Sequence, residues 1–155
     1  MDKDNMDATP ESNWINTILG LLKDADSVTR NSILESCGKE CFKESGILEK
    51  ATALKSKIEG LTDEEVLSLV QREILGEGDD APQIRKKDGM IYLEYSQCRC
   101  SLATNEYKYD DFLCECTKGF AKSLVESVFD KHADVTILKT ILRGSDSCLL
   151  AIRLL

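Results

Sequence analysis

The sequence predicts an α+β fold, in which N-terminal helices pack on an antiparallel sheet and the C-terminal half has the order ββ-α-ββ. The prediction rests on a change of period: apolar residues recur at helical spacing before residue 76 and alternate with polar residues after residue 82. With 155 residues, 42% of them hydrophobic, the chain can bury one core of its own. We therefore expect a disordered tail at 1–11 and a single domain at 12–155, with a helical part at 12–76 and a sheet part at 82–155.

Two helices are expected at the start of the domain. Ser12 can cap the first and Asp26 or Ser27 the second, because short polar side chains accept hydrogen bonds from the first N–H groups of a helix. The apolar side of the first helix consists of Trp14, Ile15, Ile18, Leu19 and Leu22. The apolar stripe of the second consists of Ile33, Leu34, Cys37 and Cys41.

Two more helices complete the helical part. The third lies between Gly46 and Gly60, since glycine ends helices readily. The fourth begins at a capping box, in which the Thr62 hydroxyl and the Glu65 carboxylate each satisfy a backbone donor of the other residue. The loop that follows it is rich in glycine and aspartate.

The sheet part is expected to contain two hairpins and a helix. Asp88 and Gly89 predict a tight turn between strands at 83–87 and 90–95, because both turn positions need a positive φ. A long apolar face predicts a helix at 117–131. The closing strands are expected at 134–142 and 147–155, on either side of a turn at Gly144, Ser145 and Asp146. Cys148 shares a strand face with Leu150, Ile152 and Leu154, which predicts a core position for it.

Charge and hydropathy exclude several classes of partner. A net charge of −8 disfavours binding to nucleic acid, because the chain repels a phosphate backbone. No apolar run reaches the roughly 20 residues of a membrane helix, and the polar N-terminus is unlike a secretory signal. We therefore expect a cytoplasmic protein without a membrane partner. In that compartment seven cysteines favour metal or thiol chemistry over a disulfide framework.

Four cysteines form two Cys-x-Cys pairs, at Cys98 and Cys100 and at Cys114 and Cys116. In extended backbone each pair directs both sulfurs to one face, so two such pairs brought together offer four thiolates to one metal ion. We predict a tetrahedral zinc site on these four residues, with an iron–sulfur cluster on four of six thiols as the alternative. The competing interpretation treats them as small buried core residues.

Cys37 and Cys41 lie four residues apart and share a helix face. They are either core residues of that helix or a third thiol pair that contacts a second metal ion or a small ligand. The sequence does not decide between the two.

A thiol-dependent hydrolase or redox enzyme is the alternative function. Cys116, and Cys114 beside it, lie at the predicted start of the helix at 117–131, where the helix dipole favours a thiolate nucleophile. The only histidine, His132, is at the far end of this helix, about 22 Å away, which argues against a Cys–His pair. The sequence therefore does not decide whether the protein is an enzyme, and the balance of these observations is against it.

The C-terminal half resembles a known type of domain. The segment from Cys114 through Gly119 and Lys122, and the strands around Gly144, Asp146 and Cys148, are similar to a bacterial family of small uncharacterised proteins. That family also carries a Cys-Gly-x-x-Cys segment, which the residues from Cys37 to Cys41 match.

The same half is similar to the four-vinyl-reductase-like domain, whose last strands bear a related Gly-Asp-x-x-Cys pattern. This resemblance implies a fold shared with haem-based nitric-oxide sensors and Golgi trafficking subunits, and a domain that binds a small molecule or a metal ion. A more distant resemblance, to the aminothiazoline-carboxylate hydrolases, implies thiol-dependent hydrolysis. The leading hypothesis is a metal- or ligand-binding, sensor-type domain, with its oligomeric state left open.

Overall fold

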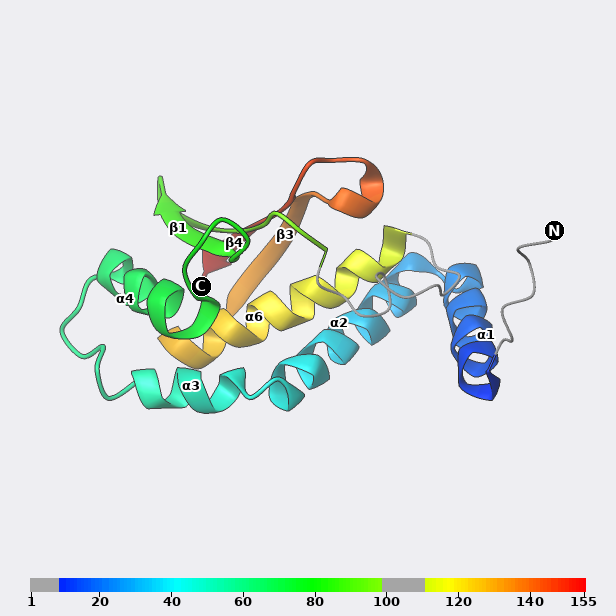
Figure 1. Cartoon of the computed structure of the whole chain (residues 1–155), viewed down its shortest axis with the longest axis horizontal. Helices are drawn as coiled ribbons and strands as arrows, with labels where there is room; N and C mark the ends of the chain where they lie inside the picture. Colours follow the sequence, from blue (N-terminus) through cyan, green and yellow to red (C-terminus); the bar gives the residue numbers. More distant parts are fainter. Residues whose placement is uncertain (1–8, 99–110) are drawn as a thin grey trace.

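The structure is a computed structural model that describes residues 9–98 and 111–155 (Figure 1). The helical half contains α1 (Pro10–Asp24), α2 (Ser27–Glu44), α3 (Ile47–Leu54), α4 (Asp63–Val70) and the short π-helix η1 (Gln71–Leu75). The second half contains β1 (Gln83–Lys87), β2 (Met90–Tyr95), the 3-10 helix η2 (Asp111–Cys114), α6 (Glu115–Phe129), β3 (Ala133–Lys139), the 3-10 helix η3 (Ile141–Arg143) and β4 (Cys148–Leu154). The predicted α+β fold is confirmed, with the helices in the N-terminal half and the four strands in the C-terminal half.

The four strands form one antiparallel sheet in the order β1-β2-β4-β3. Asp88 and Gly89 both have positive φ, at 52° and 77°, and so make the predicted turn of the first hairpin. The last strand pairs with β2 on one side and β3 on the other, so that Leu150 lies opposite Leu93 and Ile137. The two closing strands are adjacent, as predicted, but β3 ends at Lys139 and residues 141–143 turn into η3 instead.

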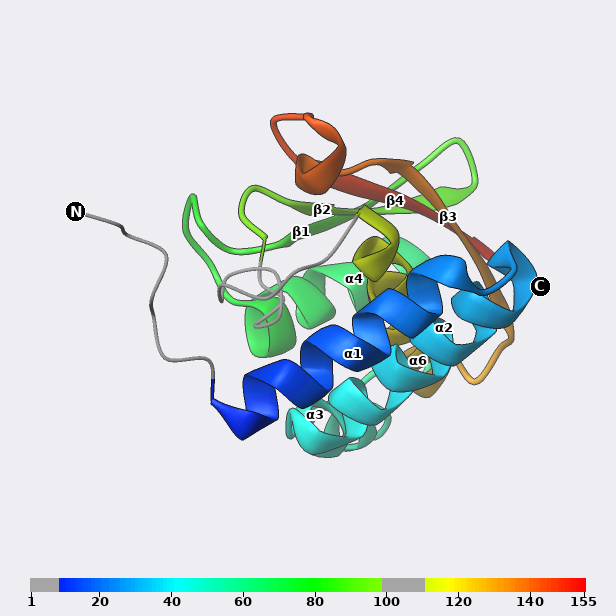
Figure 2. The ribbon, with the colours of Figure 1, turned by 90° about the vertical axis from the view of Figure 1, so that its right-hand side faces the viewer.

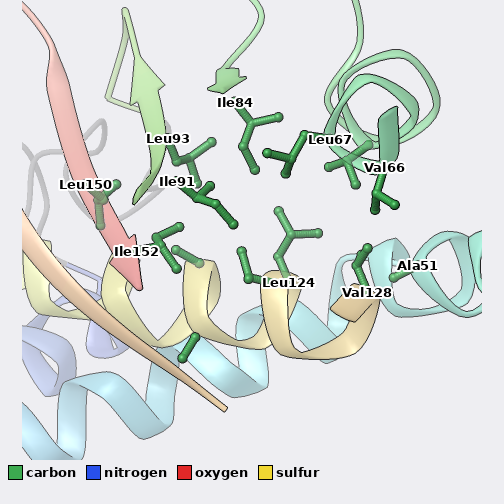
Figure 3. Packing of buried hydrophobic residues seen from close by; sticks show 14 of the residues in the cluster. Ala51, Val66, Leu67, Ile84, Ile91, Leu93, Leu124, Val128, Leu150 and Ile152 are labelled. Carbon is green, nitrogen blue, oxygen red and sulfur yellow. The ribbon is translucent and has the colours of Figure 1, made fainter. Parts of the chain in front are cut away.

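Helix α6 lies between the sheet and α2 (Figures 1 and 2). Its buried residue Leu124 points into the core that Ile91 of the sheet also lines, and Val128, one turn further on, lies beside Ala51 of α3 and Val66 of α4 (Figure 3). Fully buried aliphatic side chains of this kind contribute about 1.5–3 kcal/mol each relative to exposure. This core therefore fixes α6, and with it the start of α6, against the sheet.

Two glycines allow α2 and α6 to cross in backbone contact. A Cβ atom on Gly119 would lie 1.9 Å from the carbonyl oxygen of Glu35, and one on Gly38 would lie 1.8 Å from that of Cys116. Phe42 and Phe120 pack edge to face beside the crossing, with ring centroids 5.5 Å apart.

The predicted apolar stripe of the second helix is confirmed at Leu34 and wrong at its other three residues. Leu34, Gly38 and Phe42 are buried, whereas Ile33, Cys37 and Cys41 are exposed. The core interpretation of Cys37 and Cys41 is therefore wrong, because the face that contacts α6 is the one that carries the glycine.

The first helix differs from its prediction in where it begins and in which side chains it buries. It begins at Pro10, a residue suited to the first turn, rather than after Ser12. Leu19 is buried, and Ile15 and Leu22 pack against it, but Trp14 and Ile18 of the predicted apolar side are exposed. Of the predicted tail at residues 1–11, residues 1–8 lie outside the described residues, and Pro10 and Glu11 belong to α1.

The remaining local signals agree with the structure. The capping box is present, because Thr62 accepts from the N–H of Glu65 and the Glu65 carboxylate accepts from the N–H of Thr62. Gly46, with a φ of 76°, separates α2 from α3. In the ranges 9–98 and 111–155, every helix is too short or too polar to cross a lipid bilayer.

Candidate functional site

Three thiols, those of Cys98, Cys114 and Cys148, come together at one end of the sheet. The strand register explains two of them: Cys148 opens β4 opposite Tyr95, the last residue of β2, and Cys98 follows three residues later. The third thiol, Cys114, closes η2 at the start of α6, which the core holds against this end of the sheet. The three sulfurs are close enough for the charge of one to act on another.

Cys114 is buried and its neighbour is the buried hydroxyl of Thr140. Burial raises the pKa of the Cys114 thiol, and a hydrogen bond with the Thr140 side chain opposes that rise. The Thr140 hydroxyl oxygen also accepts from the N–H of Arg143, at 3.2 Å. Thr140 is only 2% exposed, so its polar atom is fully used between a backbone donor and a sulfur.

Cys148 receives a backbone hydrogen bond. The N–H of Ile141, the first residue of η3, donates to the Cys148 sulfur at 3.3 Å. Burial raises the pKa of the Cys148 thiol, the Ile141 N–H lowers it, and the charge of Cys98 raises it. Thr140 and Ile141, at the start of η3, thus place a hydroxyl beside the sulfur of Cys114 and an N–H donor beside the sulfur of Cys148.

A cation lies at the edge of the three-thiol group. The Arg143 guanidinium donates to the Asp111 carboxylate at 3.0 Å, which ties η3 to η2. Its positive charge lowers the pKa of the Cys114 thiol, though less than burial raises it. The predicted depression of that pKa by the helix dipole is therefore wrong for Cys114.

The predicted zinc ligands are only partly brought together. Cys98 and Cys114 are in the three-thiol group, and Cys100 lies outside the described residues. The assumption of extended backbone at Cys114 and Cys116 is wrong, because these residues belong to η2 and α6. Residues two apart on a helix point about 200° apart, and Cys116 packs instead on the apolar cluster formed by α1, α2 and η2.

No group of three histidine, cysteine or carboxylate side chains is arranged as a metal-ion site in the part of the chain that the structure describes. The six described cysteines are thiols and not disulfides. The three-thiol group is thus a cluster of interacting sulfurs rather than a preformed metal cage.

Cys37 and Cys41 are exposed on α2, which packs on the side of α6 away from the sheet. The described surface has a hollow of about 440 Å³ beside the α2–α6 crossing and another of about 390 Å³ between α4 and β1. Charged side chains line both, and neither lining includes a cysteine among the described residues. The predicted role of Cys37 and Cys41 in a ligand cavity stays a prediction.

His132 follows α6, with a side chain that is 90% exposed and 3.6 Å from the Glu126 carboxylate. This position agrees with the sequence argument that the histidine is remote from the thiols at the start of α6.

The family model of DUF6144, a family of unknown function, matches residues 2–155. The chain belongs to this family. No curated protein matches the DUF6144 chain.

Solved structures share the fold of the DUF6144 chain. A trafficking protein particle complex subunit 3 from Naegleria fowleri, covalently bound to palmitic acid, is similar with a TM-score of 0.54 and 15% identity, over 94% of this chain and 95% of the other. An H-NOX protein from S. oneidensis in the Fe(II)NO ligation state gives 0.52 and 17%, over 99% and 83%. The phenol-responsive sensory domain of the transcription activator PoxR, with phenol, gives 0.50 and 13%, over 92% and 74%.

At these identities the likeness concerns the fold alone. It agrees with the expectation of a fold shared with haem-based sensors and trafficking subunits. The narrower four-vinyl-reductase-like assignment and the hydrolase resemblance remain predictions, because the matching family is DUF6144.

Sequence reasoning missed Cys148, Thr140 and Arg143 as members of the site. Strand alternation predicts that the face of β4 carrying Cys148, Leu150 and Ile152 is buried. Leu150 and Ile152 are buried, but Cys148, the first residue of the strand, is only partly buried. The resemblance alone marked Cys148, through the pattern that follows Gly144. The pairing of β2 with β4, which brings Cys148 toward Cys98, is a long-range contact that no local pattern reveals.

Proposed function

We propose that this DUF6144 protein is a sensor-type domain that binds a metal ion through thiolates, in the cytoplasm. The ligands are Cys98, Cys114 and Cys148, with Cys100 as the fourth. Cys148 takes the place that the sequence prediction gave to Cys116. Zinc is the preferred ion, because four thiolates form its usual structural site, and an iron–sulfur cluster is the alternative.

One observation carries the proposal: the turn at η3 directs a hydroxyl at the buried sulfur of Cys114 and a backbone N–H at the partly buried sulfur of Cys148. Donors of this kind stabilise a thiolate more than a thiol. Burial alone keeps Cys114 and Cys148 protonated, with raised pKa values, so a thiolate here needs a positive centre. A bound metal ion supplies that centre, because a coordinating thiol loses its proton.

The fourth ligand follows from the chain. Cys100 comes two residues after Cys98 and forms with it the Cys-x-Cys pair on which the sequence prediction of a shared metal site rests. The three described sulfurs are not at ligand positions by themselves. We therefore propose that they close on the ion together with Cys100.

The sensor role draws on the fold. The H-NOX structure holds a nitrosyl iron, the PoxR sensory domain holds phenol, and the trafficking subunit holds palmitic acid. We extend to this chain the idea that the fold accommodates a small ligand. The core between the sheet and α6 is lined by buried aliphatic side chains that offer no metal ligand, which favours the three-thiol group over the core as the ligand-binding place.

A thiol-dependent enzyme fits less well. A nucleophilic cysteine works through a lowered pKa or an adjacent base. The pKa of Cys114 is raised, and the only histidine is exposed at the other end of α6.

Elemental analysis of protein purified without a metal-affinity step tests the proposal. We expect about one zinc, or the iron of one cluster, per chain, with a lower unfolding temperature after chelation because metal binding and folding are coupled. Cys98→Ser, Cys114→Ser and Cys148→Ser should each lose the metal.

Cys116→Ser and Cys41→Ser are the matched controls and should keep it. Variants that lose metal are checked for native secondary structure by circular dichroism, so that loss of ligand is separated from loss of fold. A metal-free wild-type protein that takes up neither zinc nor iron would refute the proposal. So would a Cys148→Ser variant that binds metal as the wild type does.

A further inference from the structure

Strand β1 forms one edge of the sheet, and part of its hydrogen-bonding capacity is unused. Residues of an antiparallel strand direct their backbone groups alternately toward and away from the neighbouring strand. The N–H of Ile84 donates to the Gln71 side chain at 2.9 Å, so Ile84 and Lys86 are the residues that face away from β2. Among the described residues, nothing bonds to the N–H or the carbonyl oxygen of Lys86. This edge therefore offers backbone groups to another extended chain.

The hollow between α4 and β1 lies beside these backbone groups. Its volume is about 390 Å³, and both Ile84 and Lys86 line it. Leu67 of α4 lies beside Ile84 of β1 (Figure 3). Because these two side chains line the hollow and are almost fully buried, they form its base. The edge of β1 is thus open on the side of α4 and not filled by the helix.

Two cations on β1 have no carboxylate partner. Arg85 and Lys87 are exposed on the outer face of the sheet, which is the face away from Ile84, and neither forms an ion pair among the described residues. The remaining cations on the described strands are each paired with a carboxylate: Lys86, Lys139 and Arg153. In a chain with a net charge of −8, the outer face of β1 is therefore a local positive surface.

We propose that β1 binds an extended segment of another protein, which adds to the sheet as a fifth strand and carries acidic side chains at alternate positions. In this mode of recognition the main-chain hydrogen bonds, here to Lys86, provide affinity, and the alternating side chains provide specificity. The acidic side chains lie on the outer face beside Arg85 and Lys87, where opposite charges on neighbouring strands stabilise the pairing. The side chains between them point into the hollow over Leu67 and Ile84, where small apolar groups gain contacts.

The same cations disfavour a second copy of this chain as the occupant. Two β1 edges that meet antiparallel have to pair Lys86 with either Lys86 or Ile84 of the partner. The first register places Arg85 opposite the partner's Lys87, and the second places it opposite the partner's Arg85. Like charges directly opposite one another destabilise a strand pair, and cations on an edge strand keep such edges apart. An acidic strand meets no such repulsion on this face.

Amide hydrogen exchange measured by NMR tests the proposal on the full chain. The probe is a peptide of alternating glutamate and valine with blocked ends, about eight residues long so that it exceeds the length of β1. We expect a saturating concentration of the peptide to slow exchange of the Lys86 amide at least about tenfold. The Arg85 amide, which already faces β2, should keep its exchange rate. The affinity should fall as salt is added, because exposed charges are screened.

One double variant and its control test the charges. Arg85→Glu combined with Lys87→Glu should weaken peptide binding at least about tenfold. Lys50→Glu combined with Lys131→Glu makes the same change in net charge at exposed residues outside β1, and should change the affinity less than about twofold. Circular dichroism confirms that both variants are folded. A peptide with proline in place of valine keeps the charges but cannot pair as a strand, and should not bind.

Several results would overturn the proposal. One is a Lys86 amide that exchanges at the same rate with and without about 1 mM peptide. Another is unchanged peptide affinity in the Arg85→Glu, Lys87→Glu variant, or equal binding of the proline peptide. Slower exchange of Lys86 as the protein concentration rises without peptide would assign this edge to a second copy of the chain, and overturns the proposal as well.

Discussion

Replacing Gly119 by alanine is expected to destabilise the protein, although alanine is the better helix former. The new Cβ atom would lie 1.9 Å from the Glu35 carbonyl oxygen, whereas ordinary contacts begin at 3.4 Å. Helices α2 and α6 would therefore have to separate by about 1.5 Å at their crossing. The clashing atom belongs to the backbone of α2, so no side-chain rotation relieves the contact.

The size of the effect follows from two opposing contributions. Overpacking of a tight contact costs about 1–3 kcal/mol, and a rigid backbone neighbour places Gly119→Ala near the upper value. The higher helix propensity of alanine relative to glycine offsets about 1 kcal/mol of this cost. We expect a net loss of about 2 kcal/mol in the free energy of unfolding, which lowers the melting temperature by about 4–8 °C for a chain of this size.

Urea unfolding followed by circular dichroism measures this loss, and Gly20→Ala is the matched control. It makes the same chemical change inside a helix, but the added methyl group meets no neighbour within 4 Å. Gly20→Ala should stabilise the chain by about 0.5–1 kcal/mol. A Gly119→Ala variant as stable as Gly20→Ala would refute the backbone crossing of α2 and α6.

Three further predictions concern stability. The side-chain amide of Gln71 donates to two carbonyl oxygens of the segment 76–84 and accepts a hydrogen bond from one of its N–H groups. Gln71→Leu should therefore lower the free energy of unfolding in urea by about 2–3 kcal/mol. An unfolding midpoint equal to that of the wild type would contradict this. Leu124→Ala, in the centre of the core, should cost about 2–5 kcal/mol, whereas Leu138→Ala at an exposed position should cost less than about 0.5 kcal/mol; equal losses would mean that the core is misplaced. The backbone N–H at the start of α4 lowers the pKa of Glu65, so its contribution is full above the pKa of the unfolded carboxyl and is lost as pH falls through the lower folded value. Glu65→Gln should therefore flatten the acid side of the stability profile, and an unchanged slope would count against this assignment.

Local patterns predict much of the fold. The capping box at Thr62, the Asp88–Gly89 turn and the apolar face of α6 are each decided by residues close in sequence, and the structure agrees with them. The stripe of α2 is the instructive failure. Its central residue, Gly38, has no apolar side chain, so a search for apolar spacing passes over it and selects Cys37 and Cys41 instead.

The site needed contacts that local patterns do not contain. The charge of Cys98 acts on Cys114, but the sequence groups the two for a reason that fails at Cys114, since the backbone there is helical. Cys148 joins them only because β4 pairs with β2, and Thr140 because β3 ends early in η3. Both facts depend on the packing of the sheet against α6.

The central claim is that Cys98, Cys100, Cys114 and Cys148 bind one metal ion. X-ray absorption at the zinc edge of the metal-loaded protein measures the ligands directly. We predict four sulfur neighbours at about 2.3 Å in the wild type and in Cys116→Ser, and three in Cys148→Ser, which has to be loaded with excess zinc because it is purified without metal. A first shell of nitrogen and oxygen atoms, or a sulfur lost in Cys116→Ser and kept in Cys148→Ser, would contradict the account.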